Sequence, residues 1–242
     1  MTILVISDVH ANLSALEAVL EDTGSFDSVW CLGDVVGYGP DPNQCVEVVR
    51  DLPNLVCLRG NHDSAIAGLS ENTKFNPTAQ EALEWTKNEL DVRQVSFLEG
   101  LPSREEIGEV TLAHGSPRDP IWEYVMDNYT ATVNFDHFST PYCFVGHSHI
   151  PFIYVMEEGE ELASRQLLKI GKWMDLPEKA LVNPGSVGQP RDNDPRASYA
   201  LYDPEERTWI NHRVEYDVKA VQQRMEKAGL PLTYIQRIIH GW

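Results

Sequence analysis

Five short apolar runs of the chain share one feature: each leads directly into residues that can bind a cation. The runs span residues 2–7, 29–32, 55–58, 110–113 and 142–145. Their lengths suit buried β-strands, and glycine or a polar residue ends each of them. In open α/β sheets, ligands bind just outside the carboxyl ends of the strands. The pattern therefore predicts that side chains scattered between positions 8 and 149 converge at one edge of the strands.

The side chains at these strand ends are carboxylates, imidazoles and one amide. They are Asp8, His10, Asp34, Asn61, His114, His147 and His149. Imidazole mixed with carboxylate and amide oxygen suits a transition metal, whereas calcium sites are richer in oxygen and structural zinc sites contain thiolates. Seven ligands exceed the need of one ion and suit two ions that share a carboxylate, for which Asp34 is the natural candidate. We expect two divalent transition-metal ions per chain, manganese before iron, zinc, cobalt or nickel.

The metal-site prediction depends on the combination of motifs. A single histidine near a loop is more often structural, and Asp-X-His at one strand end is weak evidence. His147 and His149 are stronger evidence, because alternation along a strand places both rings on one face. Five of the eight histidines lie in such motifs, whereas His137, His212 and His240 do not and are expected to be structural.

The composition limits the class of protein. Apolar residues make up 42% and charged residues 23% of the 242 residues, as in ordinary globular proteins. We expect one domain over residues 1–242, because a compact α/β architecture of this length is commonly one domain. The chain has 37 acidic and 19 basic residues, a net charge of −18. Such a surface repels phosphate backbones, so long nucleic acid is not an expected partner.

We expect a cytoplasmic protein without a membrane partner. A strand is expected from residue 3 onward with no basic or long apolar leader before it, so no signal peptide is predicted. No apolar run approaches the roughly 18 to 20 residues needed to span a bilayer. The four cysteines, Cys31, Cys45, Cys57 and Cys143, lack paired metal spacing and are expected to be buried and reduced. The oligomeric state is not predicted.

The order of expected elements indicates two sheets. Strands at 3–6, 29–32 and 55–58 alternate with helices at 12–20 and 43–52, as in a largely parallel sheet. Further helices are expected at 77–90, 91–98, 218–228 and 232–239, and a hairpin at 104–113 across Gly108-Glu109. Later strands are expected at 152–156, 162–170, 180–182, 197–202 and 208–214. We expect these later strands to form a second, antiparallel-rich sheet packed against the first.

The motifs resemble a known family. The series Asp8-Val9-His10, Gly33-Asp34, Gly60-Asn61-His62-Asp63, His114 and Gly146-His147-Ser148-His149 is similar to the five-motif signature of calcineurin-like metallophosphoesterases, in that family's order. The resemblance implies an α/β (α+β) fold: a four-layer αββα sandwich of two mixed β-sheets flanked by helices, with a di-metal site at the C-terminal ends of strands.

The resemblance also implies residue roles. Asp8, His10, Asp34 and His149 would bind one ion, and Asp34, Asn61, His114 and His147 the other. His62 corresponds to the family's catalytic acid and would ligate neither ion. The expected function is hydrolysis of a small phosphorylated substrate, a phosphodiester or nucleotide, by a metal-bridging hydroxide with His62 as general acid. The alternatives are a phosphomonoesterase, a dinucleoside polyphosphate hydrolase, or a catalytically silent scaffold for protein interaction.

The chain departs from the phosphoprotein phosphatases just after Asp34. That branch carries Asp and Arg where this chain has Gly37 and Tyr38, so protein phosphatase activity is not expected. The loop looks more like that of small prokaryotic phosphoesterases, as does the glycine-rich segment 183–191. The expected substrate contacts are Asn61, Tyr38 and Arg191. Asn12, Arg118, Trp122 and Tyr124 are further candidates, although ordinary packing explains the two aromatic residues equally well.

Overall fold

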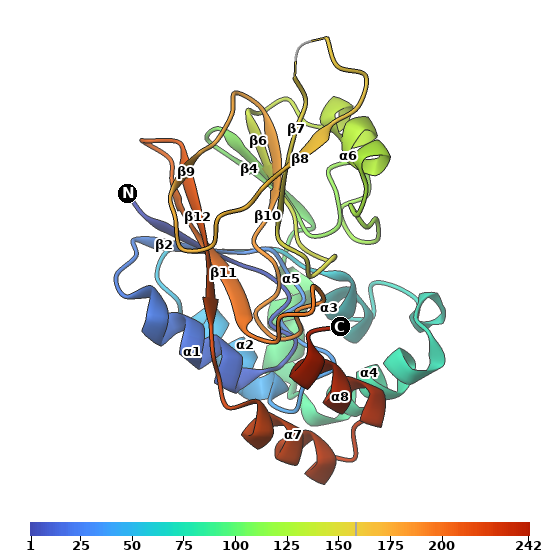
Figure 1. The fold of residues 1–242 in the computed structure, drawn as a ribbon. Helices are drawn as coiled ribbons and strands as arrows, with labels where there is room; N and C mark the ends of the chain where they lie inside the picture. The colour runs from blue at the N-terminus through green and yellow to red at the C-terminus, as the bar shows by residue number, and fades with distance from the viewer. Residues whose placement is uncertain (158) are drawn as a thin grey trace.

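The protein is described by a computed structural model that covers residues 1–157 and 159–242 (Figure 1). Within this part of the chain the strands form two six-stranded sheets. In spatial order, the first contains β3 (Leu55–Cys57), β2 (Ser28–Cys31), β1 (Ile3–Ile6), β11 (Ala197–Asp203), β12 (Thr208–Val214) and β9 (Met174–Asp175). The second contains β4 (Arg104–Ile107), β5 (Val110–Ala113), β6 (Tyr142–Phe144), β10 (Ala180–Asn183), β7 (Phe152–Val155) and β8 (Ser164–Gln166).

The first sheet is mixed. β1, β2 and β3 pair in parallel, because helices α1 (Leu13–Thr23) and α2 (Pro42–Arg50) return the chain between them. β11 then pairs antiparallel with β1, and β12 antiparallel with β11. This arrangement brings the carboxyl ends of the three parallel strands to one edge, as predicted.

The second sheet is also mixed. β4 and β5 form the predicted hairpin, in which Ile107 pairs with Val110 across two residues. Gly108 has a φ of +57°, a conformation that suits glycine in such a turn. β5, β6 and β10 are parallel neighbours, while β7 and β8 continue the sheet in antiparallel pairing.

The layers follow from where the apolar side chains lie. Val5, Phe144 and Trp209 belong to the core between the two sheets. The outer face of the first sheet packs on α1, α2 and α5 (Val92–Gly100), and that of the second on α6 (Asn128–Asn134), as Figure 1 shows for α1 and α6. The order helix, sheet, sheet, helix confirms the predicted αββα sandwich.

One prediction about the sheets is wrong. The later strands do not form a sheet of their own, because β11, β12 and β9 complete the first sheet and β4, β5 and β6 belong to the second. The pairing of β1 with β11 covers an edge that three parallel strands would otherwise expose. The strand expected at 162–170 is limited to Ser164–Gln166, since Leu162 and Leu167 are 52% and 81% exposed and do not enter the core.

The remaining helices lie near the carboxyl ends of the first sheet. They are α3 (Asn61–Ile66), α4 (Pro77–Glu89), α7 (Val218–Lys227) and α8 (Leu232–His240). Two 3₁₀ turns also occur, one at Asn72–Lys74 and one directly after α6 at Phe135–His137. α4, α7 and α8 pack together with the ring of Tyr38. The sequence did not indicate α3 and α6, which are short. None of the helices in the described residues is long and apolar enough to cross a membrane.

Candidate metal centre

The seven predicted ligands come together between the two sheets. Asp8, Asp34 and Asn61 follow β1, β2 and β3 of the first sheet, while His114 and the His147–His149 pair follow β5 and β6 of the second. Each of the seven side chains is at most 4% exposed. Burial of so many polar groups requires that each finds a hydrogen-bond partner or a cation.

The backbone turns sharply at most of these positions. The residues with left-handed φ between +47° and +62° include Asp8, His10, Asp34, His147 and His149. Non-glycine residues seldom adopt this conformation, and those that do cluster at functional sites. Here the turns direct the side chains back over the strand ends.

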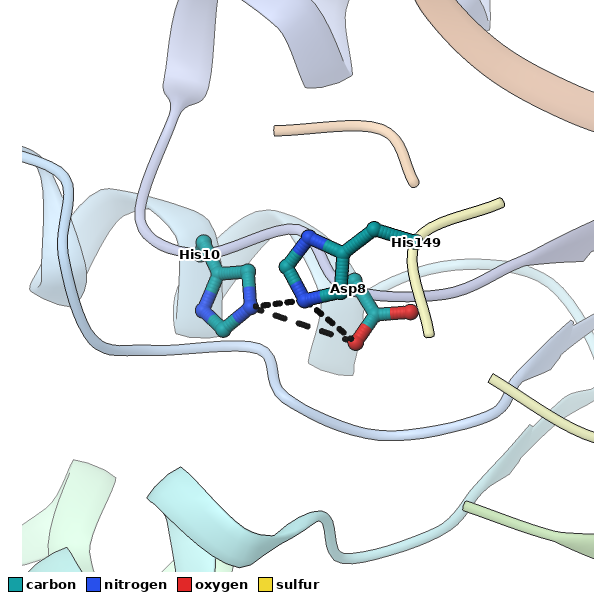
Figure 2. Close-up of side chains that lie close together, drawn as sticks. All are labelled: Asp8, His10 and His149. Carbon is teal, nitrogen blue, oxygen red and sulfur yellow. Dashed lines mark hydrogen bonds and ion pairs between the residues drawn. The ribbon is translucent and has the colours of Figure 1, made fainter. Parts of the chain in front are cut away.

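One cluster consists of Asp8, His10 and His149 (Figure 2). The Nε2 atoms of His10 and His149 lie 3.1 Å apart, and Asp8 Oδ1 is 3.4 Å from His149 Nε2 and 3.9 Å from His10 Nε2. Asp8 Oδ1 has no hydrogen-bond partner, whereas Asp8 Oδ2 accepts a hydrogen bond from the backbone N–H of His147. The three side chains therefore point toward a common centre.

A second cluster consists of Asp34, His114, His147 and Asn61. His114 Nε2 lies 3.3 Å from Asp34 Oδ2, 3.2 Å from His147 Nδ1 and 3.2 Å from Asn61 Oδ1. Asp34 Oδ2 also lies 3.7 Å from His10 Nε2 in the first cluster and has no hydrogen-bond partner. Asp34 thus faces both clusters with one oxygen, while its other oxygen accepts from the backbone N–H of His62.

Backbone carbonyls hold the outer nitrogen of each ring. His10 Nδ1 donates to Val36, His149 Nδ1 to Gln189, His114 Nδ1 to Leu32 and His147 Nε2 to Trp122. A carbonyl can only accept, so in the neutral rings the inner nitrogens carry lone pairs. In each cluster the inner ring nitrogens and a carboxylate oxygen face one another, an arrangement that suits a cation. The residues therefore fit two divalent metal ions.

The electrostatics agree with this fit. Burial lowers the pKa values of His10, His147 and His149, which favours their neutral, metal-binding form. Burial raises the pKa of Asp8 to about 7. Burial would lower the pKa of His114, but the facing Asp34 outweighs it and raises that pKa to about 9. A cation bound at this centre would favour the deprotonated forms of Asp8 and His114.

His62 lies beside both clusters. One of its ring nitrogens lies within 4.8 Å of the facing atoms of His10 and Asp34. Its ring packs against His10, Tyr38 and Phe75 at centroid distances of 4.9, 4.3 and 4.9 Å. Burial lowers its pKa to about 4. His62 thus lies beside the candidate ligands, and its role as a proton donor stays a prediction.

The surroundings of Gly37 explain why this chain lacks the aspartate that phosphoprotein phosphatases carry at this position. A Cβ atom at Gly37 would overlap the ring of His62 at Nδ1, and its φ is +93°. An acidic side chain could not occupy this position without moving the histidine. His62 Nδ1 is buried without a hydrogen-bond partner, so rings rather than a carboxylate hold His62 in place.

Asp63 supports the centre and was not predicted. Its carboxylate accepts hydrogen bonds from the backbone N–H groups of Gly60, Val35 and Val36, at 3.0, 3.3 and 3.2 Å. It thereby joins the loop that carries Asp34 to the loop that carries Asn61 and His62. An acidic residue three positions after a helix N-cap was the available signal.

The three predicted substrate contacts, Arg191, Tyr38 and Asn61, differ in burial and in their distance from the two clusters. The Arg191 guanidinium lies 5.9 Å from the centre of the Tyr38 ring, and Arg191 Nε is buried without a hydrogen-bond partner. Burial lowers the pKa of His149, and the charge of Arg191 lowers it further, so Arg191 lies close to the first cluster. Tyr38 is 8% exposed, and Asn61 belongs to the second cluster.

Asn12 and Arg118 have other partners. The side chain of Asn12 caps α1 by accepting from Ala15 N and donates to the carbonyl of Gly188, so it is not free to contact a substrate. Arg118 forms an ion pair with Glu123. Both side chains therefore have partners within the protein, and neither was among the three expected substrate contacts.

The αββα fold and the two buried donor clusters define an α/β protein with a candidate metal centre. The sequence matches the calcineurin-like phosphoesterase superfamily domain over residues 1–207, and the chain belongs to this family. Family membership implies phosphoester hydrolysis as the general activity.

Individual relatives differ in how much of the chain they match. Uncharacterized protein MJ0912 of Methanocaldococcus jannaschii is 42% identical over 247 residues, covering 99% of this chain and 98% of that one. The crystal structure of a metallophosphoesterase from Sphaerobacter thermophilus is 47% identical, has a TM-score of 0.91, and matches 100% of this chain and 99% of its own. The symmetrical bis(5'-nucleosyl)-tetraphosphatase of Pectobacterium carotovorum is 33% identical over 106 residues, which is 37% of each protein.

Proposed function

We propose that this protein hydrolyses a small phosphorylated molecule, a phosphodiester or a nucleotide, at two divalent transition-metal ions. The observation that carries the proposal is the pair of buried donor clusters that share Asp34 Oδ2, each with imidazole nitrogens that face a carboxylate oxygen. Asp8, His10, Asp34 and His149 would hold one ion, and Asp34, Asn61, His114 and His147 the other. Mixed nitrogen and oxygen ligands are compatible with manganese, the metal we propose first, and with iron, zinc, cobalt or nickel.

Two such ions would bind phosphoryl oxygens, take up developing negative charge and lower the pKa of a bound water. Side chains of the protein would supply the proton donor and a further contact to the phosphoryl group. His62 would donate a proton to the departing oxygen, because its ring lies beside both clusters. Burial lowers the pKa of His62, and a phosphoryl anion next to the ring would favour the protonated form.

Arg191 would bind a non-bridging phosphoryl oxygen. Among the described residues its Nε, next to the first cluster, has no hydrogen-bond partner, while its Nη2 donates to Gln189 Oε1; Arg118, in contrast, is paired with Glu123. A phosphomonoester dianion needs more positive charge than a diester monoanion, and Tyr38 stands where phosphatases have a second cation. We therefore propose that diesters are the better substrates.

The test is hydrolysis by metal-loaded protein. The protein loaded with Mn²⁺ should hydrolyse bis(p-nitrophenyl) phosphate with a higher kcat/KM than p-nitrophenyl phosphate. Chelation should abolish both activities, and added Mn²⁺, Co²⁺ or Ni²⁺ should restore them. Equal or better hydrolysis of the monoester would contradict the proposed ester class, and activity that survives chelation with no bound metal would contradict the proposed centre.

A dinucleoside polyphosphate hydrolase is the second candidate. The match to the symmetrical bis(5'-nucleosyl)-tetraphosphatase of Pectobacterium carotovorum supports it, although that match spans 37% of each protein. Diadenosine tetraphosphate should be included in the same screen, with products separated by chromatography. The intact donor set gives less support to a silent scaffold, and turnover of any ester would exclude that alternative.

The proposed setting is the cytoplasm. The four cysteines are free and buried, as expected in a reducing compartment. The net charge of −18 favours a small phosphorylated substrate over long nucleic acid.

A further inference from the structure

The loop formed by residues 115–127 runs beside the second cluster. On it, the ring of Tyr124 stacks on the ring of His147, with centroids 3.7 Å apart and planes 20° from parallel. Tyr124 is nevertheless 44% exposed, while the next residue, Val125, is buried. Tyr124 therefore covers a candidate metal ligand with one face and leaves ring surface open to solvent directly outside the centre.

Two further rings connect this loop to His62. Phe75 packs edge-on against His62 at 4.9 Å and against Trp122 at 5.2 Å. Phe75 and Trp122 are both half-buried. The surface beside the proposed proton donor is thus aromatic.

The loop is fixed by polar contacts of its own. The carboxylate of Glu123 accepts hydrogen bonds from Ser116 Oγ at 2.7 Å and from Asn134 Nδ2 on α6 at 2.8 Å, and it pairs with Arg118. The carbonyl of Trp122 is held by His147. A ring carried by a backbone with these contacts is already oriented before a ligand binds, which lowers the entropy cost of binding.

Two cations flank these rings on a chain that is strongly acidic. Lys74 Nζ lies 4.6 Å from the centre of the Trp122 ring. Arg191 lies near Tyr38, and its charge lowers the pKa of the Tyr124 hydroxyl, which burial raises. Partly exposed aromatic surface with cations close to it suits a ligand that joins a flat ring to a phosphate.

We infer that Tyr124 and Trp122 form a stacking platform for the base of a nucleotide whose phosphate lies at the metal centre. This inference rests on the proposed function and narrows it to base-bearing substrates. Phosphate esters without a base would reach the same centre but would lack this contact.

The direct test compares AMP with ribose 5-phosphate, which differ only in the base. Calorimetric titration of the Mn²⁺-loaded protein should give a Kd for AMP that is lower by about tenfold or more, the effect typical of one stacked base. Both ligands are monoesters, which the proposed diester preference makes poor substrates. Equal Kd values in the unaltered protein would overturn the inference.

Substitutions then locate the contact. Tyr124→Ala should bring the two Kd values within about threefold of each other, whereas Tyr124→Phe should keep most of the preference, since stacking needs the ring alone. Tyr129→Ala on α6, where the side chain is 69% exposed, is the matched control. A full AMP preference in both Tyr124→Ala and Trp122→Leu would also overturn the inference.

The experiments distinguish a failure of the platform from a failure of the proposed phosphoesterase activity. Hydrolysis of bis(p-nitrophenyl) phosphate together with equal Kd values for AMP and ribose 5-phosphate would overturn the platform and leave the phosphoesterase intact. A clear AMP preference without hydrolysis of any ester would support the platform and contradict the enzyme.

Discussion

The metal centre and the rim around it are built in different ways. The rim consists of Tyr38, Phe75, Trp122, Tyr124 and Arg191. The candidate ligands of the centre are at most 4% exposed, and backbone groups fix its four imidazole rings and two carboxylates, whereas the rim packs through rings and reaches 44% exposure at Tyr124. On the proposed function, this difference assigns the reaction to the centre and the choice of substrate to the rim.

Asp34→Asn should cause the largest loss, because Asp34 faces both clusters. Its volume hardly changes, but the shared negative charge disappears, so kcat/KM should fall by on the order of 10³ or more. Mn²⁺ should raise the melting temperature of the unaltered protein and leave that of Asp34→Asn nearly unchanged, since a ligand stabilises only the state that binds it.

Asp136→Asn is the matched control for Asp34→Asn, because Asp136 is exposed on the turn after α6. It should retain normal turnover and the normal thermal shift. If Asp34→Asn kept its full metal content and changed the choice of substrate, the distinction between centre and rim would be wrong.

His62→Asn should separate chemistry from metal binding. His62 lies beside the clusters, and its N–H to Asp34 is a backbone group that the substitution keeps. Turnover should fall by on the order of 10² to 10⁴ for a lost general acid, and less for a good leaving group. Metal analysis should find the normal content, as in the control His137→Asn; an emptied centre would show that His62 is a ligand instead.

The centre was predictable because its signal is local. Each ligand follows an apolar run within a few residues, and strand alternation and sheet geometry then bring Asp8 and His149 together although they are far apart in sequence. The motif resemblance added their division between two ions, which remains a prediction. Asp63 was missed because the sequence pattern of a helix cap does not show whether the same carboxylate also joins two loops.

The rim and the division of strands between the sheets were not predictable in this way. Whether β11 pairs with β1 or with a later strand depends on which edge the folded chain leaves open, and the runs themselves are equally apolar. Trp122 and Phe75 meet through two loops without regular alternation, so no periodicity indicates that contact. Arg118 and Arg191 are equivalent in sequence terms, and only the structure shows that Glu123 binds one of them.

Arg191→Met should test the rim without emptying the centre. Loss of a charged hydrogen bond to a phosphoryl oxygen costs about 1.5–3 kcal/mol, so kcat/KM should fall by about 10- to 150-fold. The loss should be larger for the monoester than for the diester, and metal content should stay normal. Arg93→Met on α5, where the side chain is 79% exposed, is the control; equal activity in both variants would assign the phosphoryl contact to another group.

Tyr38→Arg should give the smallest change, because it should alter only the choice of substrate. It therefore tests the role of the rim separately from that of the centre. The ring of Tyr38 lies between His10, His62 and Tyr234, so a guanidinium placed there would stack on aromatic rings and add charge near the centre. Arg191 is close enough to repel it, which limits the gain. We expect the ratio of diester to monoester kcat/KM to fall by about threefold to tenfold, within the range for one partly offset charged contact. Tyr38→Leu, which removes the ring without adding charge, should leave the ratio higher than Tyr38→Arg does. An equal ratio in the two variants would show that charge at position 38 does not set the ester class.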